Sequence, residues 1–239
     1  MILARSLLYL LSMVISTILL AGILSIIGWL LPYRQRCLIA NAWGTVNLWS
    51  LKFFCRLDYR IEGLEKIPES GAIVLAKHQS AWETMALRSL LPPEQAWVLK
   101  RELMWVPFFG WAAATVQPIA IDRKAGRKAA KQVIETGIKR LAQNRLVVIF
   151  PEGTRVAPGQ RKRYGMGGAL LAEKTGAPII PVAHNAGSFW KRRDIRKYPG
   201  TVTVIVGDPI LTRDRKAAEI NQEVENWIES QMEQIQPTK

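Results

Sequence analysis

Two histidines, His78 and His184, are the natural candidates for proton-transfer chemistry in this sequence. His78 follows an apolar run that ends at Ala76, and active residues of open α/β sheets gather at the carboxyl ends of strands. Glu83 lies five residues further on. A carboxylate bonded to one ring nitrogen fixes the imidazole tautomer and leaves the other nitrogen as a base. The spacing therefore indicates a catalytic dyad of His78 and Glu83.

The same residues also have a purely structural interpretation. Ser80 is a natural helix N-cap, and the pattern from Ser80 to Glu83 is the S-x-x-E signature of a capping box. Glu83 would then lie in the first helical turn and bond to backbone N–H groups. A carboxylate can cap a helix and orient an imidazole at once, so spacing alone leaves both roles open.

A second candidate segment is Phe150-Pro151-Glu152-Gly153-Thr154-Arg155. Its first residue is the last residue of the apolar run Leu146–Phe150. Proline and glycine favour a turn here, and Gly153 lets the backbone approach a ligand closely. Arg155 offers a planar fork of donors that matches phosphate oxygens. We predict a phosphate-binding turn at this position.

Further cations follow two other expected strands. Lys100 and Arg101 come after Trp97–Leu99, and Arg123 comes after Ile119–Ile121. Cations at several strand ends predict one pocket for a phosphate monoester. The alternative is a set of solvated surface charges, the usual fate of Lys and Arg, which is favoured for Lys100 and Arg101 taken singly.

Short apolar runs alternate with amphipathic segments after Arg56. This alternation predicts one α/β layered domain over residues 57–239, with a largely parallel or mixed sheet flanked by helices. The expected strands include Gly71–Ala76, Leu146–Phe150, Pro178–Val182 and Thr201–Val206, and the expected helices cover about 129–141 and 217–228.

The N-terminal segment has the composition of a membrane anchor. The run from Leu7 to Tyr33 contains no charged residue, and about 20 apolar residues suffice to span a bilayer. A cleaved signal peptide would have a shorter apolar region, and a buried core helix is disfavoured by the length. The following run, Cys37 to Cys55, is rich in aromatics, as is typical near lipid headgroups. We predict a membrane-embedded helical anchor over residues 1–56 and leave open whether it spans or re-enters.

The strong positive charge of the chain limits the classes of partner that it is expected to bind. The chain has 33 Lys and Arg against 19 Asp and Glu, a net charge of +14. Such an excess attracts nucleic acid, anionic membranes or phosphate-bearing substrates. We find no zinc-finger spacing and no RNP-type block, so we expect no nucleic-acid partner. Histidines and cysteines are too few and scattered for a metal site, and the basic domain is placed on the cytoplasmic face of the membrane.

The two candidate segments together resemble the glycerolipid acyltransferase family, typified by bacterial 1-acylglycerol-3-phosphate (lysophosphatidic acid) acyltransferases. That family pairs an H-x4-D motif with F-P-E-G-T-R/S, and the resemblance covers about residues 60 to 210. Glu83 stands where the family usually has aspartate. Gln117 and Ala120 replace the glycine and phenylalanine of the family's G-x-x-F-I-x-R block, which ends here at Arg123.

The resemblance implies roles for individual residues. His78 would be the general base, Glu83 would orient it, and Pro181 would shape the acyl-donor side. Substrate would be bound by Lys100, Arg123, Glu152, Gly153, Thr154 and Arg155.

The resemblance also implies a reaction. An acyl group would pass from acyl-CoA or acyl carrier protein to the free hydroxyl of 1-acyl-sn-glycerol 3-phosphate, without a cofactor, at the inner membrane. The acceptor could instead be another lysophospholipid, glycerol 3-phosphate or an aminolipid. A non-catalytic membrane-bound lipid-binding protein is the alternative from another functional class.

Overall fold

The structure, a computed structural model, describes residues 1–235 apart from the side chains of Arg123 and Arg127. Within that range, seven strands form one sheet of order β1-β7-β6-β2-β5-β3-β4. Strands β6 and β7 are antiparallel, and the other neighbours run parallel. The predicted α/β class with a mixed sheet is confirmed. The helices are α1 (Ile2–Ile27), α2 (Tyr33–Ser50), α3 (Trp82–Leu90), α4 (Phe109–Thr115), α5 (Arg127–Leu141), α6 (Gly167–Thr175), α7 (Ala186–Phe189) and α8 (Ala217–Ile235), and the strands are β1 (Leu57–Glu62), β2 (Ile73–Ala76), β3 (Gln95–Lys100), β4 (Ile119–Ile121), β5 (Leu146–Ile149), β6 (Ile179–His184) and β7 (Gly200–Val206).

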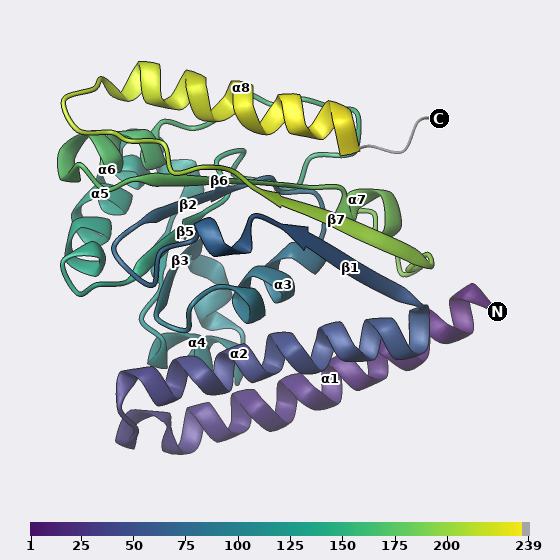
Figure 1. Cartoon of the computed structure of the whole chain (residues 1–239). Coiled ribbons are helices and arrows are strands. Elements are labelled where there is room, and N and C mark those ends of the chain that lie inside the picture. The colour runs from purple at the N-terminus through teal and green to yellow at the C-terminus, as the bar shows by residue number, and fades with distance from the viewer. Residues whose placement is uncertain (236–239) are drawn as a thin grey trace.

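The centre of the sheet is apolar on both faces. Every residue of β2 and β5 is buried, as expected for parallel strands that are covered by helices on two sides. Side chains alternate between the faces, so that Val74 and Ala76 belong to one core whereas Ile73 and Leu75 belong to another. We call the first the α3 face, because α3 packs on it, and the second the α8 face, because α5, α6 and α8 cover it (Figure 1).

Helix α8 shows why the outer layer forms. Ile220, Val224, Ile228 and Met232 recur every fourth residue and are all buried. Residues four apart lie on one side of a helix, so this stripe covers the sheet while the opposite side stays polar. Both amphipathic helices expected from the sequence, α5 and α8, are present.

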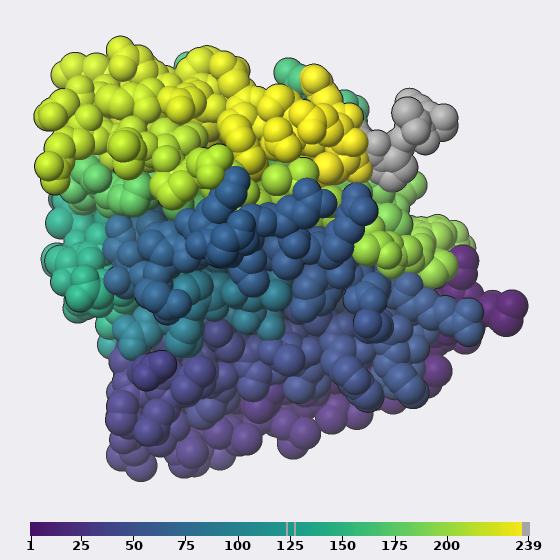
Figure 2. Space-filling view, in the orientation of Figure 1, coloured from purple at the N-terminus to yellow at the C-terminus, as the bar shows by residue number. Residues whose placement is uncertain are grey.

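Helices α1 and α2 lie side by side and form a further layer below α3 and α4 (Figure 1); they make up the lower part of the molecule in Figure 2. Helix α1 is fastened near both ends. The Oγ of Ser6 accepts the backbone N–H of Lys197 at 2.9 Å, and the Oγ of Ser25 donates to the carbonyl of Phe108 at 3.2 Å. The helix therefore follows the domain along its length.

The outer side of α1 remains apolar and exposed. The segment Ile2–Leu30 is long and apolar enough to cross a membrane, yet only 17% of its most apolar window is buried. Leu11, Ile18 and Leu19 are each more than half exposed. Such a surface is stable next to lipid rather than water, so the N-terminal segment supports membrane association. The division of the chain at residues 56 and 57 stays a prediction.

Candidate active site

The predicted dyad is brought together at the end of β2. The alternation of that strand continues past Ala76 and directs Lys77 toward the α8 face and His78 toward the α3 face. Nδ1 of His78 lies 2.8 Å from Oε1 of Glu83. Helix α3 begins at Trp82 with Ala81 as its N-cap, which corrects the expected cap at Ser80.

The Glu83 carboxylate both orients His78 and holds the start of the helix. Its Oε1 also accepts the backbone N–H groups of Gln79 and Ser80, at 2.8 and 2.7 Å. Burial raises the pKa of Glu83, but His184, His78 and the Ser80 N–H together bring that pKa below its ordinary value. The carboxylate is therefore ionised and accepts the Nδ1–H of His78, which leaves Nε2 of His78 as the base.

A ring stack fixes the plane of the imidazole. The rings of His78 and Phe150 lie 4.0 Å apart between centroids with an angle of 7° between their planes. Phe150 is in turn packed edge-on by Trp97, at 5.8 Å. Two independent contacts, one polar and one aromatic, thus hold the imidazole in a single orientation.

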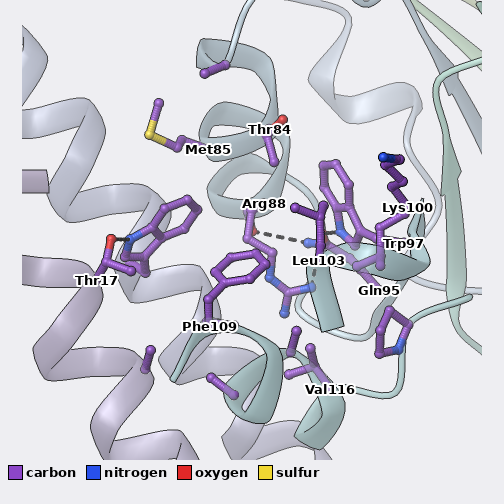
Figure 3. Close-up of a pocket in the computed structure, with 18 of the residues that line it drawn as sticks. Thr17, Thr84, Met85, Arg88, Gln95, Trp97, Lys100, Leu103, Phe109 and Val116 are labelled. Atoms are coloured by element: carbon purple, nitrogen blue, oxygen red, sulfur yellow. Dashed lines mark hydrogen bonds between the residues drawn. The ribbon is translucent and has the colours of Figure 1, made fainter. Parts of the chain in front are cut away.

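His78 faces a cavity of about 550 Å³ that is mostly apolar. In Figure 3, Trp97, Arg88 and Phe109 project into the space between Thr17 of α1 and Lys100 of β3. The apolar walls come from α1, α2, α3, α4, β3 and the segments that follow β3 and α4. They include Met13, Leu20, Leu24, Ile39, Trp43, Met85, Val98, Leu103, Phe109 and Val116. A long aliphatic chain matches such walls.

Cations gather where the cavity meets the sheet edge. Because β2, β3 and β5 run parallel, their carboxyl ends lie together, and Lys100, Thr154 and Arg155 all line the cavity beside His78. Nζ of Lys100 is 3.0 Å from Oε1 of Glu102. Among the described residues, the Arg155 guanidinium has no hydrogen bond or ion pair. It is placed to bind an anion.

Two further residues predicted to bind substrate are Gly153 and Arg123. Gly153 has a φ of +66°, the left-handed region that favours glycine, and a Cβ there would meet no atom within 4 Å. The turn thus requires glycine for its backbone conformation rather than for space. The side chain of Arg123 lies outside the part of the chain that the structure describes, so its role stays a prediction.

Glu152 was expected to bind substrate, but its carboxylate lies beneath the cavity. It is fully buried, and its Oε1 lies 2.8 Å from Nζ of Lys77. Its Oε2 accepts the backbone N–H of His78 at 2.6 Å. The reason is the turn after β5, which directs Phe150 to the α3 face and Glu152 away from it. In this structure the Glu152 carboxylate therefore holds the backbone of His78.

Pro181 is also placed differently from the expectation. It pairs in register with Leu75, a member of the α8-face core, and it is absent from the cavity lining. Its neighbours Ile180 and Val182 belong to the α3-face core, so strand alternation places Pro181 on the opposite face. A direct contact of Pro181 with an acyl donor in this cavity is not supported.

A buried ionic cluster on the α8 face was not anticipated. Nζ of Lys77 lies 2.6 Å from Oε1 of Glu229 in α8 as well as near Glu152, and the hydroxyl of Tyr164 donates to Glu229 at 3.0 Å. Burial raises the pKa of Glu152 to about 7, although Lys77 acts in the opposite direction. The position of Lys77, next to His78 after an alternating strand, was the available signal.

Arg192 is a cavity residue that strand-end reasoning missed. It lies in the loop after α7, lines the cavity, and its guanidinium donates to the carbonyl of Arg155 at 3.2 Å. The basic run Lys191-Arg192-Arg193 was a signal in the sequence, but no expected strand directed it to the site.

Comparison with known proteins supports the same interpretation. Residues 58–185 match the family described as Acyltransferase. The chain is 42% identical over 212 residues to a 1-acyl-sn-glycerol-3-phosphate acyltransferase from Pseudomonas aeruginosa, covering 87% of this chain and 82% of that protein. It is 30% identical to a 1-acyl-sn-glycerol-3-phosphate acyltransferase from Cocos nucifera, covering 90% and 69%.

A solved structure has the same fold. The crystal structure of a 1-acyl-sn-glycerophosphate acyltransferase from Thermotoga maritima superposes with a TM-score of 0.80 and covers 100% of this chain and 98% of that one. The sequence identity is 21%, so this likeness shows the fold alone.

Proposed function

The chain belongs to the acyltransferase family, and from this premise we propose that it acylates the free hydroxyl of 1-acyl-sn-glycerol 3-phosphate to give phosphatidic acid. The observation that carries the proposal is the imidazole of His78, held by Glu83 beside the cations of an otherwise apolar cavity. The acceptor carries a phosphate, a hydroxyl and an acyl chain. The cavity offers a complementary group for each.

The proposed chemistry is direct transfer. Nε2 of His78 removes the hydroxyl proton while the oxygen attacks the thioester carbonyl of acyl-CoA or acyl carrier protein. The ionised Glu83 stabilises the imidazolium that forms. The tetrahedral intermediate then expels the thiolate, which takes the proton from His78. No cofactor takes part, and the products are an ester and a free thiol.

Arg155 is the proposed principal ligand of the acceptor phosphate. Its guanidinium is uncommitted among the described residues, and its fork matches two phosphate oxygens. Arg192 lies beside it and Lys100 lines the same cavity, so both add positive charge. Arg123 remains a further proposed ligand.

The membrane placement follows from the exposed apolar surface. Trp105, Phe108 and Trp111 are each more than half exposed, and Phe108 meets α1 at Ser25. Aromatic side chains of this kind are typical of the lipid headgroup level. We propose that α1 and α2, which wall the cavity, lie in the cytoplasmic leaflet of the inner membrane. Lysolipid would then enter from the leaflet.

The test is an acceptor panel with the purified full chain in mixed micelles, using labelled acyl-CoA. We expect lysophosphatidic acid to be acylated with a kcat/KM at least about tenfold above that of monoacylglycerol, because one charged hydrogen bond contributes about 1.5–3 kcal/mol. Arg155→Gln should raise the KM for lysophosphatidic acid about tenfold. The matched control is Arg196→Gln, an exposed arginine that does not line the cavity. Preference for the acceptor without phosphate would overturn the proposal.

A further inference from the structure

The peptide bond before the base is held on both sides. The carbonyl of Lys77, which belongs to this peptide, lies 2.7 Å from Nε2 of His184. The N–H of the same peptide, that of His78, donates to Glu152 at 2.6 Å. The preceding N–H, that of Lys77, donates to the carbonyl of Val182 at 2.9 Å. The contact on the carbonyl side comes from His184, a second histidine that has no role in the acyl-transfer chemistry described above.

The protonation state of His184 follows from its two contacts. Its Nδ1 accepts the backbone N–H of Ala186 at 3.3 Å, so the proton resides on Nε2 and is donated to the Lys77 carbonyl. Burial lowers the pKa of His184, although Glu83 acts in the opposite direction. His184 is therefore a neutral donor and, being fully buried, cannot meet substrate.

The same imidazole faces the second oxygen of Glu83. Oε1 of Glu83 takes the bond from His78, whereas Oε2 is buried, has no hydrogen bond among the described residues, and lies 3.9 Å from Nε2 of His184. The Glu83 side chain thus lies between the two histidines. His184 touches the machinery at two points, through the backbone and next to the carboxylate.

We propose that His184 is a positioning residue of the acyl transfer: its Nε2–H, next to Glu83, fixes the Lys77 carbonyl and so keeps the His78 ring in reacting geometry. The proposal rests on the proposed function. Without this donor, the Lys77 carbonyl would be buried without its partner, and the peptide would rotate to find another one. Because the nitrogen of that peptide belongs to His78, rotation of the peptide would displace the His78 ring from the acceptor hydroxyl.

The experiment compares replacements of His184 in the full chain with lysophosphatidic acid and labelled acyl-CoA. His184→Gln carries an amide nitrogen at about the position of Nε2 and should keep kcat within about threefold. His184→Leu removes the donor and should lower kcat about 10- to 100-fold, since displacements near 1 Å have effects of this size. The KM values of both substrates should stay within about twofold. The control is Asn185→Leu, which removes buried bonds to Thr203 and Ile235 instead.

The outcomes separate the two proposals. If the wild-type chain fails to acylate lysophosphatidic acid, the proposed function is lost. Suppose instead that the wild type is active. The positioning role is then wrong if His184→Leu loses no more kcat than Asn185→Leu at a matched fall in Tm. It is also wrong if His184→Gln is as impaired as His184→Leu. Should the leucine variant not fold, His184→Asn replaces it. Its amide stops one methylene short of the carbonyl, so wild-type kcat in that variant would equally overturn the inference.

Discussion

Lys77 and His78 are consecutive residues whose side chains lie on opposite faces of one sheet and have opposite surroundings. On the α8 face, the amine of Lys77 is 1% exposed and contacts two carboxylates, Glu152 and Glu229. On the α3 face, the ring of His78 contacts one carboxylate and the cavity. The charged groups of the first face are paired with one another. The second face leaves a ring nitrogen available.

The two faces meet in a single residue. The side chain of Glu152 belongs to the ionic cluster, yet one of its oxygens accepts the backbone N–H of His78. The carbonyl of His78 in turn accepts the N–H of Val156, which follows the proposed phosphate-binding turn. The buried face therefore contributes rigidity to the reacting face, and substitutions on each face should have different signatures.

The largest effect should follow removal of the base. His78→Ala is expected to lower kcat about 10³- to 10⁴-fold, because a positioned general base contributes up to that factor. The Tm and the binding of lysolipid, measured by equilibrium dialysis, should change little. Acylation at the wild-type rate in this variant would show that His78 is not the base.

Removal of the orienting charge should come next. Glu83→Gln is expected to lower kcat about 10²-fold, since the amide no longer stabilises the imidazolium. Glu83→Asp keeps the charge but shortens the side chain, and we expect a smaller loss. The two rates, measured at saturating donor and acceptor, separate charge from reach. Equal losses would show that charge and reach matter alike, and a wild-type rate in Glu83→Gln would show that the charge is not needed.

On the opposite face, the expected effect is on stability. Lys77→Met leaves two buried carboxylates without their cation and should lower the free energy of unfolding by about 3–5 kcal/mol. The kcat per folded molecule should fall far less than in His78→Ala. Urea unfolding in detergent gives the first quantity and single-turnover rates give the second. Lys174→Met, an exposed position on α6, is the control.

The smallest effect should be a pH dependence of stability. The pKa of Glu152 is raised to about 7, so the folded state favours its protonated form relative to the unfolded state. This contribution is complete below the ordinary pKa of a glutamate and is lost as pH rises through about 7. Glu152→Gln should flatten that part of the stability profile between pH 5 and 8. An unchanged profile, equal to that of the exposed control Glu219→Gln, would contradict the assignment.

Local sequence patterns predicted the elements of the sheet and the dyad. The runs before His78 and Pro151 are short, apolar and rich in β-branched residues, and both form buried strands. The separation of His78 and Glu83 sufficed because a strand end followed by a helix start keeps the two side chains near each other. The contact between His78 and Glu83 could therefore be predicted from a few consecutive residues.

The sequence patterns did not predict which face of the sheet a side chain occupies, nor the contacts between segments far apart in the chain. Glu152 and Pro181 were assigned from motifs, but the turn after β5 directs Glu152 away from the cavity, and strand alternation does the same for Pro181. Strand β1, which pairs with β7 across more than 140 residues of chain, carries charges that hid its pattern. Arg192 reaches the site from a loop. No periodicity encodes such contacts.

The N-terminal helices form one wall of the cavity, with Leu20 and Leu24 of α1 and Trp43 of α2 among its lining residues. A recombinant fragment starting at residue 57 would retain His78 and the proposed phosphate-binding turn but would lack this wall. The hydrocarbon tail of a bound lysolipid would then contact water or detergent along that side. Trimming the chain to gain solubility would remove part of the cavity together with the exposed apolar helix.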